Sequence, residues 1–197
     1  MRSPRLCLLF ASLLACAACS TAGAVPADLS ALLAEAPPDV PARLWLDGDR
    51  IVGAAVAVGP GEVPADARRT AEAVQPRGER VFQGREWGPR GEGYRIDVHY
   101  AGDAGPEHSR SLLVTADGRV LERSHTVPIP DVPQHVLASA MQIAARIDEA
   151  RIVSGPEHEE YWSVQVHDRS GRVWVVEVTL DGRIVRSLRR TPARVDG

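Results

Sequence analysis

Apolar and polar residues alternate strictly in two stretches of this chain. Between residues 94 and 100, and again between residues 162 and 167, every second side chain is apolar and those between are polar or charged. A period of two is typical of a β-strand that buries one face and exposes the other to water. His99 and His167 lie near the ends of these predicted strands, each on the polar face.

Two other stretches have the wider spacing of an amphipathic helix. Val63-Pro64 introduces the first, which extends to about Gln75, because proline is well suited to the first helical position. Pro133 introduces the second helix. One face of that helix carries Val136, Ala140, Ile143 and Ile147.

Asp-Gly pairs separate apolar runs at residues 47–48, 117–118 and 181–182. Both central residues of a type I′ hairpin turn need positive φ, a conformation that Asp-Gly adopts readily. The first pair predicts a leading hairpin over residues 44–58. The other two predict a closing hairpin in each half of the chain.

The order of helix, strands and Asp-Gly hairpin occurs twice, which predicts an α+β fold made of two tandem helix-plus-antiparallel-sheet units. The first unit covers residues 43–126 with its leading hairpin, and the second covers residues 127–190. A short tail, 191–197, follows. An Ala/Pro-rich tether at residues 25–42 precedes the two units.

Residues 1–24 have the pattern of a bacterial signal peptide, with two arginines ahead of an apolar run too short to span a bilayer. Two outcomes stay open. The leader matches a lipobox, with Cys16 or Cys19 as the lipidated residue, or it is cleaved after Ala24. We expect a protein of the cell envelope, either lipid-anchored and facing the periplasm or soluble in the periplasm.

Composition excludes several chemistries. All 23 basic residues are arginine, so no lysine is present for a Schiff base or a P-loop. The three cysteines lie within the leader, and no Gly-x-Ser-x-Gly motif occurs. The formal charge of −3 does not favour nucleic-acid binding. We therefore expect no enzyme activity, no cofactor and no nucleic-acid partner.

The second predicted unit resembles the PepSY and PepSY-like families of envelope domains. The resemblance rests on the Val132-Pro133 helix entry, the strand opening at Tyr161-Trp162 and the turn at Leu180-Asp181-Gly182. The first unit resembles a divergent copy. The resemblance implies a non-catalytic module that binds a protein or peptide, with peptidase inhibition as one form of that role.

Arg85, Trp87 and Arg90 form the strongest candidate binding group, because tryptophan and arginine are enriched at binding hot spots. They lie in the Gly-rich segment 84–93, which we interpret as a loop. Its tryptophan either binds a partner or folds back on the core. The partner would be an envelope protein or peptide. If the lipobox is used, the protein also binds the membrane through its lipidated N-terminus.

His99 and His167 carry the alternative function, a periplasmic sensor of a metal or small ligand. If the two predicted units pair symmetrically, these histidines would approach one another. A structural envelope protein without a dedicated ligand is a third hypothesis.

Overall fold

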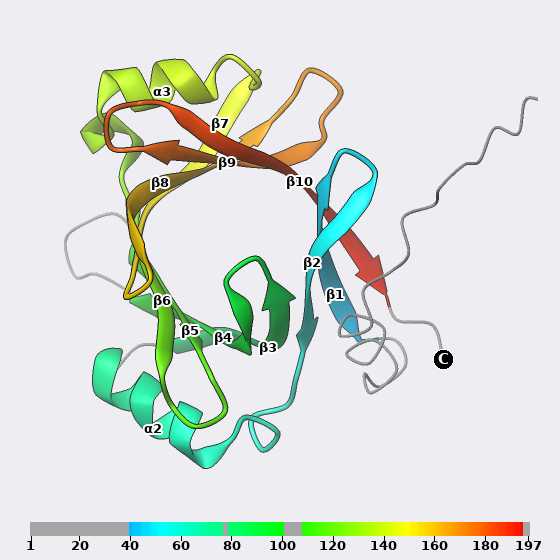
Figure 1. The fold of residues 1–197 in the computed structure, drawn as a ribbon, viewed down its shortest axis with the longest axis vertical. Helices are drawn as coiled ribbons and strands as arrows, with labels where there is room; N and C mark the ends of the chain where they lie inside the picture. The colour runs from blue at the N-terminus through cyan, green and yellow to red at the C-terminus, as the bar shows by residue number, and fades with distance from the viewer. Residues whose placement is uncertain (1–39, 77–78, 101–107, 195–197) are drawn as a thin grey trace, which may run out of the picture.

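In residues 40–76, 79–100 and 108–194, which the computed structural model describes, ten antiparallel strands form one closed barrel. Each strand pairs with the next along the chain, and β1 pairs with β10 to close the ring (Figure 1). The elements are β1 (Pro41–Asp47), β2 (Arg50–Ala57), α2 (Ala65–Val74), β3 (Glu79–Gly88), β4 (Gly91–Tyr100), β5 (His108–Val114), β6 (Val120–Val127), η1 (Ile129–Asp131), α3 (Gln134–Ala140), β7 (Arg146–Gly155), β8 (His158–His167), β9 (Val173–Thr179) and β10 (Ile184–Arg194).

The three Asp-Gly turns lie where the sequence predicts them. They join β1 to β2, β5 to β6 and β9 to β10, and the φ angles of Gly48, Gly118 and Gly182 are 61°, 87° and 92°. A side chain at these positions would be strained, which explains glycine in each turn. The predicted leading hairpin is therefore confirmed as β1 and β2.

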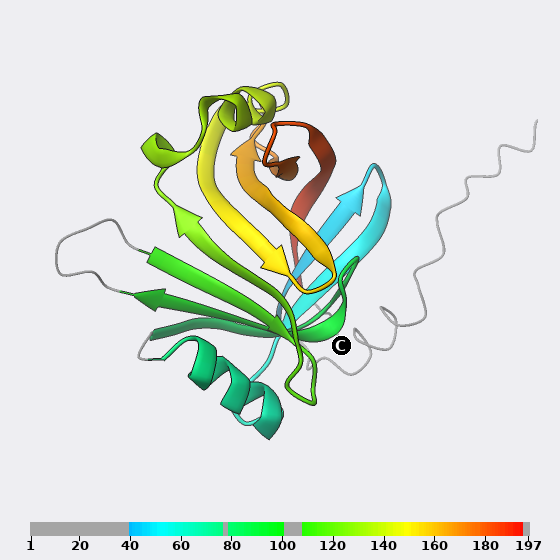
Figure 2. The same cartoon turned by 60° about the vertical axis from the view of Figure 1, so that its left-hand side comes forward.

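The two α-helices lie on the outside of the barrel (Figures 1 and 2). The strands beneath them turn their apolar side chains outward, toward the helices. Ile96 and Val98 of β4 are buried in one cluster with Ala67 and Ala71 of α2. A second cluster places α3 over β7, β8 and β9. Burial of these apolar surfaces holds the helices to the barrel. The polar faces of the strands consequently turn inward.

The predicted α+β fold of two tandem units is wrong. Strands from both predicted units, including the leading hairpin β1–β2, belong to one closed barrel. The prediction failed because the polar face of each strand was interpreted as facing water, which leaves an open sheet with a helix on one side. In the structure the polar faces line a closed interior instead.

The segment 84–93 is not a loop. It forms the end of the β3–β4 hairpin nearest the two-residue turn, Pro89-Arg90. The glycines allow close packing of strands: a Cβ on Gly93 would lie 2.7 Å from the carbonyl oxygen of Val114. A Cβ on Gly84 would lie 2.9 Å from the carbonyl oxygen of Val56 on the neighbouring strand β2.

The second helix is shorter than its apolar stripe predicts. α3 ends at Ala140, and Ile147 belongs to β7. The amide of Ala145 donates to the carbonyl oxygen of His167, so the chain enters the β7–β8 ladder at that point. Pairing with β8 therefore overrides the local helical pattern. Among the described residues, no helix has the length and apolar character needed to cross a membrane.

Candidate functional site

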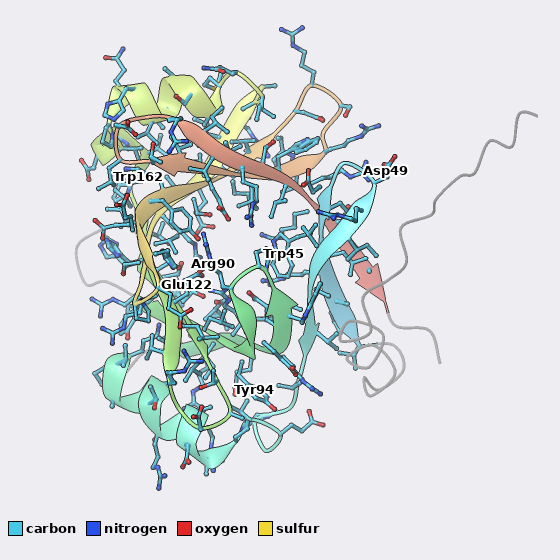
Figure 3. The ribbon with its side chains drawn as sticks, viewed as in Figure 1. Trp45, Asp49, Arg90, Tyr94, Glu122 and Trp162 are labelled. Carbon is cyan, nitrogen blue, oxygen red and sulfur yellow. The ribbon has the colours of Figure 1, made fainter. Side chains whose placement is uncertain are left out.

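The inward-facing residues line a cavity of about 190 Å³ within the barrel, which is partly open to solvent. We call this space the inner chamber. Figure 3 shows Trp45, Arg90 and Glu122 directed into the ring of strands. The charged side chains that line the chamber are Arg43, Glu86, Arg90, Arg95, Asp97, Glu122, Glu149, Arg151, Glu177 and Arg190.

Arg95 of β4 is the central group on one side of the chamber. Its guanidinium donates to both carboxylate oxygens of Glu86, at 2.7 and 2.9 Å, and to Glu122 at 2.7 Å. It also donates to the hydroxyl of Ser111 at 3.2 Å. The side chains of Arg95, Glu86 and Glu122 are 15 %, 10 % and 9 % exposed, so these charges are largely removed from water.

The ionisation of this group follows from its geometry. Burial lowers the pKa of Arg95, but Glu86 and Glu122 outweigh that effect and raise it well above its ordinary value. Burial opposes the charge on Glu122, yet Arg95 and Arg90 hold its pKa below the ordinary value. Arg95 and Glu122 therefore remain charged at neutral pH.

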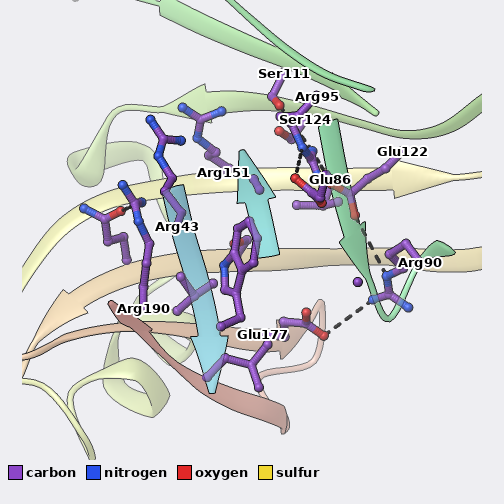
Figure 4. A pocket seen from close by; sticks show the side chains of 18 of the residues that line it. Arg43, Glu86, Arg90, Arg95, Ser111, Glu122, Ser124, Arg151, Glu177 and Arg190 are labelled. Carbon is purple, nitrogen blue, oxygen red and sulfur yellow. Dashed lines mark hydrogen bonds and ion pairs between the residues drawn. The ribbon is translucent and has the colours of Figure 1, made fainter. Parts of the chain in front are cut away.

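Arg90 lies in the β3–β4 turn and reaches into the same end of the chamber. Its guanidinium lies 3.5 Å from Glu177 and 3.9 Å from Glu122 (Figure 4), and 5.0 Å from the ring centre of Tyr161. The Tyr161 hydroxyl donates to Glu122 at 3.3 Å. Burial raises the pKa of Glu177 above its ordinary value because Arg90 compensates only in part.

Arg43, Arg151 and Arg190 gather away from this group, as Figure 4 shows. Arg151 pairs with Glu149 at 2.7 Å, and Arg43 lies 3.8 Å from Asp97. Arg190 donates to the neutral side chain of Gln165 at 2.5 Å. Burial and the neighbouring charge of Arg43 lower the pKa of Arg190.

The candidate binding residues of the sequence do not form one site. Arg85 and Trp87 lie on the outer face of β3, where Arg85 pairs with Glu92 at 2.5 Å. Trp87 packs against the buried residues Ala54 and Val56, in an apolar cluster that also contains Ala42. Arg90, by contrast, points into the chamber.

The candidate metal residues are also apart. His99 lies on β4 and His167 on β8, with three strands between them in the barrel. The Nε2 atom of His167 lies 2.7 Å from the carboxylate of Asp148. Within the described ranges no group of three or more His, Cys, Asp or Glu residues is arranged to hold a metal ion. Cys16 and Cys19 lie outside the described residues.

Sequence reasoning missed most of the chamber. Its residues are spread over all ten strands, so no local motif contains them. The available signal was charge on the polar face of strands. Arg95 and Asp97 lie on the polar face of the 94–100 alternation, a face that the pattern alone assigns to water.

Comparison with known proteins gives similarity at the level of structure only. No family model and no curated protein matches this chain. The resemblance to the PepSY families is therefore wrong, since no family match supports it and the expected tandem units are replaced by one barrel.

Several solved structures from Bacteroides are similar to this chain. One from Bacteroides eggerthii, described as a periplasmic protein, has a TM-score of 0.49 and 14 % identity, and the match covers 66 % of this chain and 90 % of that one. A DUF2874 family protein from Bacteroides uniformis has a TM-score of 0.47 and 14 % identity, with 64 % and 88 % covered. A BLIP-like protein from Bacteroides fragilis has a TM-score of 0.41 and 16 % identity, with 68 % and 88 % covered. None of these similarities assigns a ligand to this chain.

Proposed function

We propose that this protein is an exported, non-catalytic binding protein of the bacterial envelope that holds a small polar ligand in its inner chamber. The observation that carries the proposal is the cavity itself, a space of about 190 Å³ inside the barrel, lined by charged side chains. An entirely structural barrel interior would instead be filled by side chains. Export follows from the leader, with Cys16 or Cys19 as the lipidated residue if the lipobox is used.

The size of the chamber selects the class of ligand. A cavity of about 150 Å³ is enough for benzene, whereas pockets for drug-sized molecules measure roughly 300–1,000 Å³. The volume of the inner chamber, about 190 Å³, lies between these two values and suits a molecule with one ring or a short chain. A peptide segment would not fit inside it.

A thermal-shift screen tests this proposal. Neutral sugars, amino acids and small carboxylates are added to residues 25–197, because a ligand that binds only the folded state raises the melting temperature. Ser163 lines the chamber, so Ser163→Leu fills part of it and should abolish the shift. Val185, which is 52 % exposed, provides the control Val185→Leu. A shift that persists in Ser163→Leu, or no shift from any compound, contradicts the proposal.

A specific observation favours a second candidate, the binding of a protein or peptide. Trp87 lines a groove of about 450 Å³ together with Ile51, Pro89 and Arg186. A groove of that volume can accept side chains of a partner, and tryptophan and arginine are suited to such contacts.

Trp87→Ala separates the two roles of this side chain. If Trp87 serves only the apolar cluster, its truncation lowers the free energy of unfolding by about 3 kcal/mol and leaves capture of envelope proteins unchanged. If it binds a partner, a defined protein retained by residues 25–197 is lost in the variant while its melting temperature is preserved. Trp87→Phe keeps an aromatic side chain and serves as the control.

A further inference from the structure

The ten charged side chains of the inner chamber are divided unequally between its two ends. The carboxylate-rich end contains Arg90 and Arg95 with Glu86, Glu122 and Glu177. The arginine-rich end contains Arg43, Arg151 and Arg190 with Asp97 and Glu149. One end thus has a carboxylate in excess and the other has an arginine in excess.

Arg190 is the arginine in excess. Asp97 and Glu149 lie against Arg43 and Arg151, respectively. Among the described residues, no carboxylate lies within ion-pair distance of Arg190, and its hydrogen bond goes to the amide of Gln165. Asp97 and Glu149 attract Arg190 from beyond ion-pair distance, but burial and the charge of Arg43 outweigh them and lower its pKa. A guanidinium that is partly removed from water without a direct ion pair is costly, and an anionic ligand would relieve that cost.

Arg43 provides a second donor at the same place. Its separation of 3.8 Å from Asp97 is longer than a good charge-assisted hydrogen bond of about 2.7–2.9 Å. Arg43 and Arg190 also influence one another directly, since the charge of Arg43 lowers the pKa of Arg190. Two guanidinium groups with capacity to donate therefore lie near one point of the chamber wall.

Aromatic side chains stand beside these arginines. Trp45 is the cross-strand partner of Arg190 in the β1–β10 pairing, and both line the chamber. The guanidinium of Arg43 lies 4.1 Å from the ring centre of Phe82. The guanidinium of Arg43 therefore covers that face of Phe82, and Trp45 is the apolar surface beside the arginines. A flat aromatic side chain suits a ring or a short hydrocarbon chain.

We propose that the arginine-rich end binds the oxyanion, carboxylate or phosphate, of a small molecule whose apolar part lies against Trp45. This inference rests on the proposed function of the chamber. The excess carboxylate at the opposite end disfavours a second anionic group on the ligand. A monoanion therefore binds more tightly than a dianion with an acidic group at each end.

Calorimetric titration at pH 7 with four probes tests the inference. Benzoate and phenyl phosphate carry the oxyanion, benzamide is the neutral counterpart, and terephthalate carries a second carboxylate. We expect the two oxyanions to bind, benzamide to bind at least about tenfold more weakly, and terephthalate to bind more weakly than benzoate. The tighter of benzoate and phenyl phosphate identifies the oxyanion that the site prefers.

Arg190→Gln removes the unpaired charge and keeps a polar side chain. We expect benzoate affinity to fall by about 10–100-fold, as for the loss of charge-assisted hydrogen bonds, while benzamide binding is unchanged. The melting temperature should equal or exceed that of the parent, since the variant relieves repulsion with Arg43. Arg189, the next residue on β10, pairs with Asp49 at 3.9 Å, and Arg189→Gln is the matched control.

Unchanged benzoate affinity in Arg190→Gln, or equal affinity for benzamide and benzoate, overturns the anion site and leaves the chamber function standing. If terephthalate binds as tightly as benzoate, the claim that the carboxylate-rich end disfavours a second anionic group is overturned. If none of the four probes binds but a neutral compound shifts the parent in the thermal screen, the anion inference alone fails. If neither experiment gives binding, both proposals fail.

Discussion

Arg95 shows how a single residue keeps a charged barrel interior compatible with a stable fold. Its guanidinium satisfies two carboxylates and a hydroxyl at once, so few of its donors are left without an acceptor. A buried ion pair adds little stability compared with an apolar replacement, but removing one partner leaves an uncompensated charge. The same arrangement therefore makes the interior sensitive to loss of Arg95.

We expect Arg95→Met to lower the free energy of unfolding by about 3–5 kcal/mol at pH 7, because Glu86 and Glu122 then lack their arginine. The loss should depend on pH. In the parent, the pKa of Glu122 is held below 4.5, so its contribution to stability is present above that pH and disappears as the pH falls.

In Arg95→Met, burial dominates and the pKa of Glu122 rises. The free-energy cost of burying the charged Glu122 carboxylate is therefore largest at neutral pH and vanishes when the group is protonated. Urea unfolding at pH 7 and pH 4 measures both curves. The difference between parent and variant should shrink at pH 4. Replacing both glutamates by glutamine in the variant should restore part of the stability at pH 7. An equal loss at both pH values would contradict this account.

At the scale of elements, local pattern predicts the strands well and their orientation poorly. The alternation at residues 94–100 correctly predicts β4, and each Asp-Gly pair correctly predicts a hairpin. A period of two shows that the faces of a strand differ but not which face points into the molecule. That choice depended on where α2 and α3 pack, which is a property of the whole fold.

The same reasoning explains the missed chamber. Glu86 lies in the Gly-rich segment 84–93, whose composition predicts a loop, and Glu177 lies within the mostly apolar run 173–180. These two carboxylates lie far apart in the sequence, yet both line the chamber because the barrel brings β3 and β9 around one space. Only the closure of the sheet assembles the site.

The attachment of α3 to the outer face can be tested on one side chain. Val136 is fully buried among residues of β8 and β9, so Val136→Ala should lower the free energy of unfolding by about 2–3 kcal/mol. Met141, the C-cap of the same helix, is 48 % exposed, and Met141→Ala should change stability by about 0.5 kcal/mol or less. Chemical unfolding measures both. A similar loss in the two variants would show that α3 does not bury its apolar face on the barrel.

At the scale of the whole molecule, the pairing of β1 with β10 decides whether a chamber exists. These strands lie at opposite ends of the described chain, and their register aligns Pro41 with Arg194 and Leu46 with Arg189. Closure removes the two unpaired strand edges that an open sheet would present. It also closes the longest loop of the fold, which is costly in chain entropy.

A cross-link across this pair tests closure directly. Ala42 and Ala193 are partners in the register, and both belong to the outer apolar cluster. Cross-strand partners lie within the Cα separation that a disulfide requires, so Ala42→Cys with Ala193→Cys should form one on oxidation. Since every natural cysteine lies in the leader, residues 25–197 of this variant contain only these two thiols.

The disulfide encloses nearly the whole barrel, so it should stabilise the oxidised protein by roughly 5 kcal/mol relative to the reduced form, in the chain-entropy account. Non-reducing electrophoresis and melting temperatures with and without reductant measure the two effects. Ala42→Cys with Val185→Cys is the control, because Val185 lies outside the β1–β10 register and should not form the link. If the first pair links only between molecules, the sheet is open in solution and the inner chamber has no wall on that side. If it links within the molecule and melts at a higher temperature, the chamber and its two charged ends are enclosed by one continuous sheet.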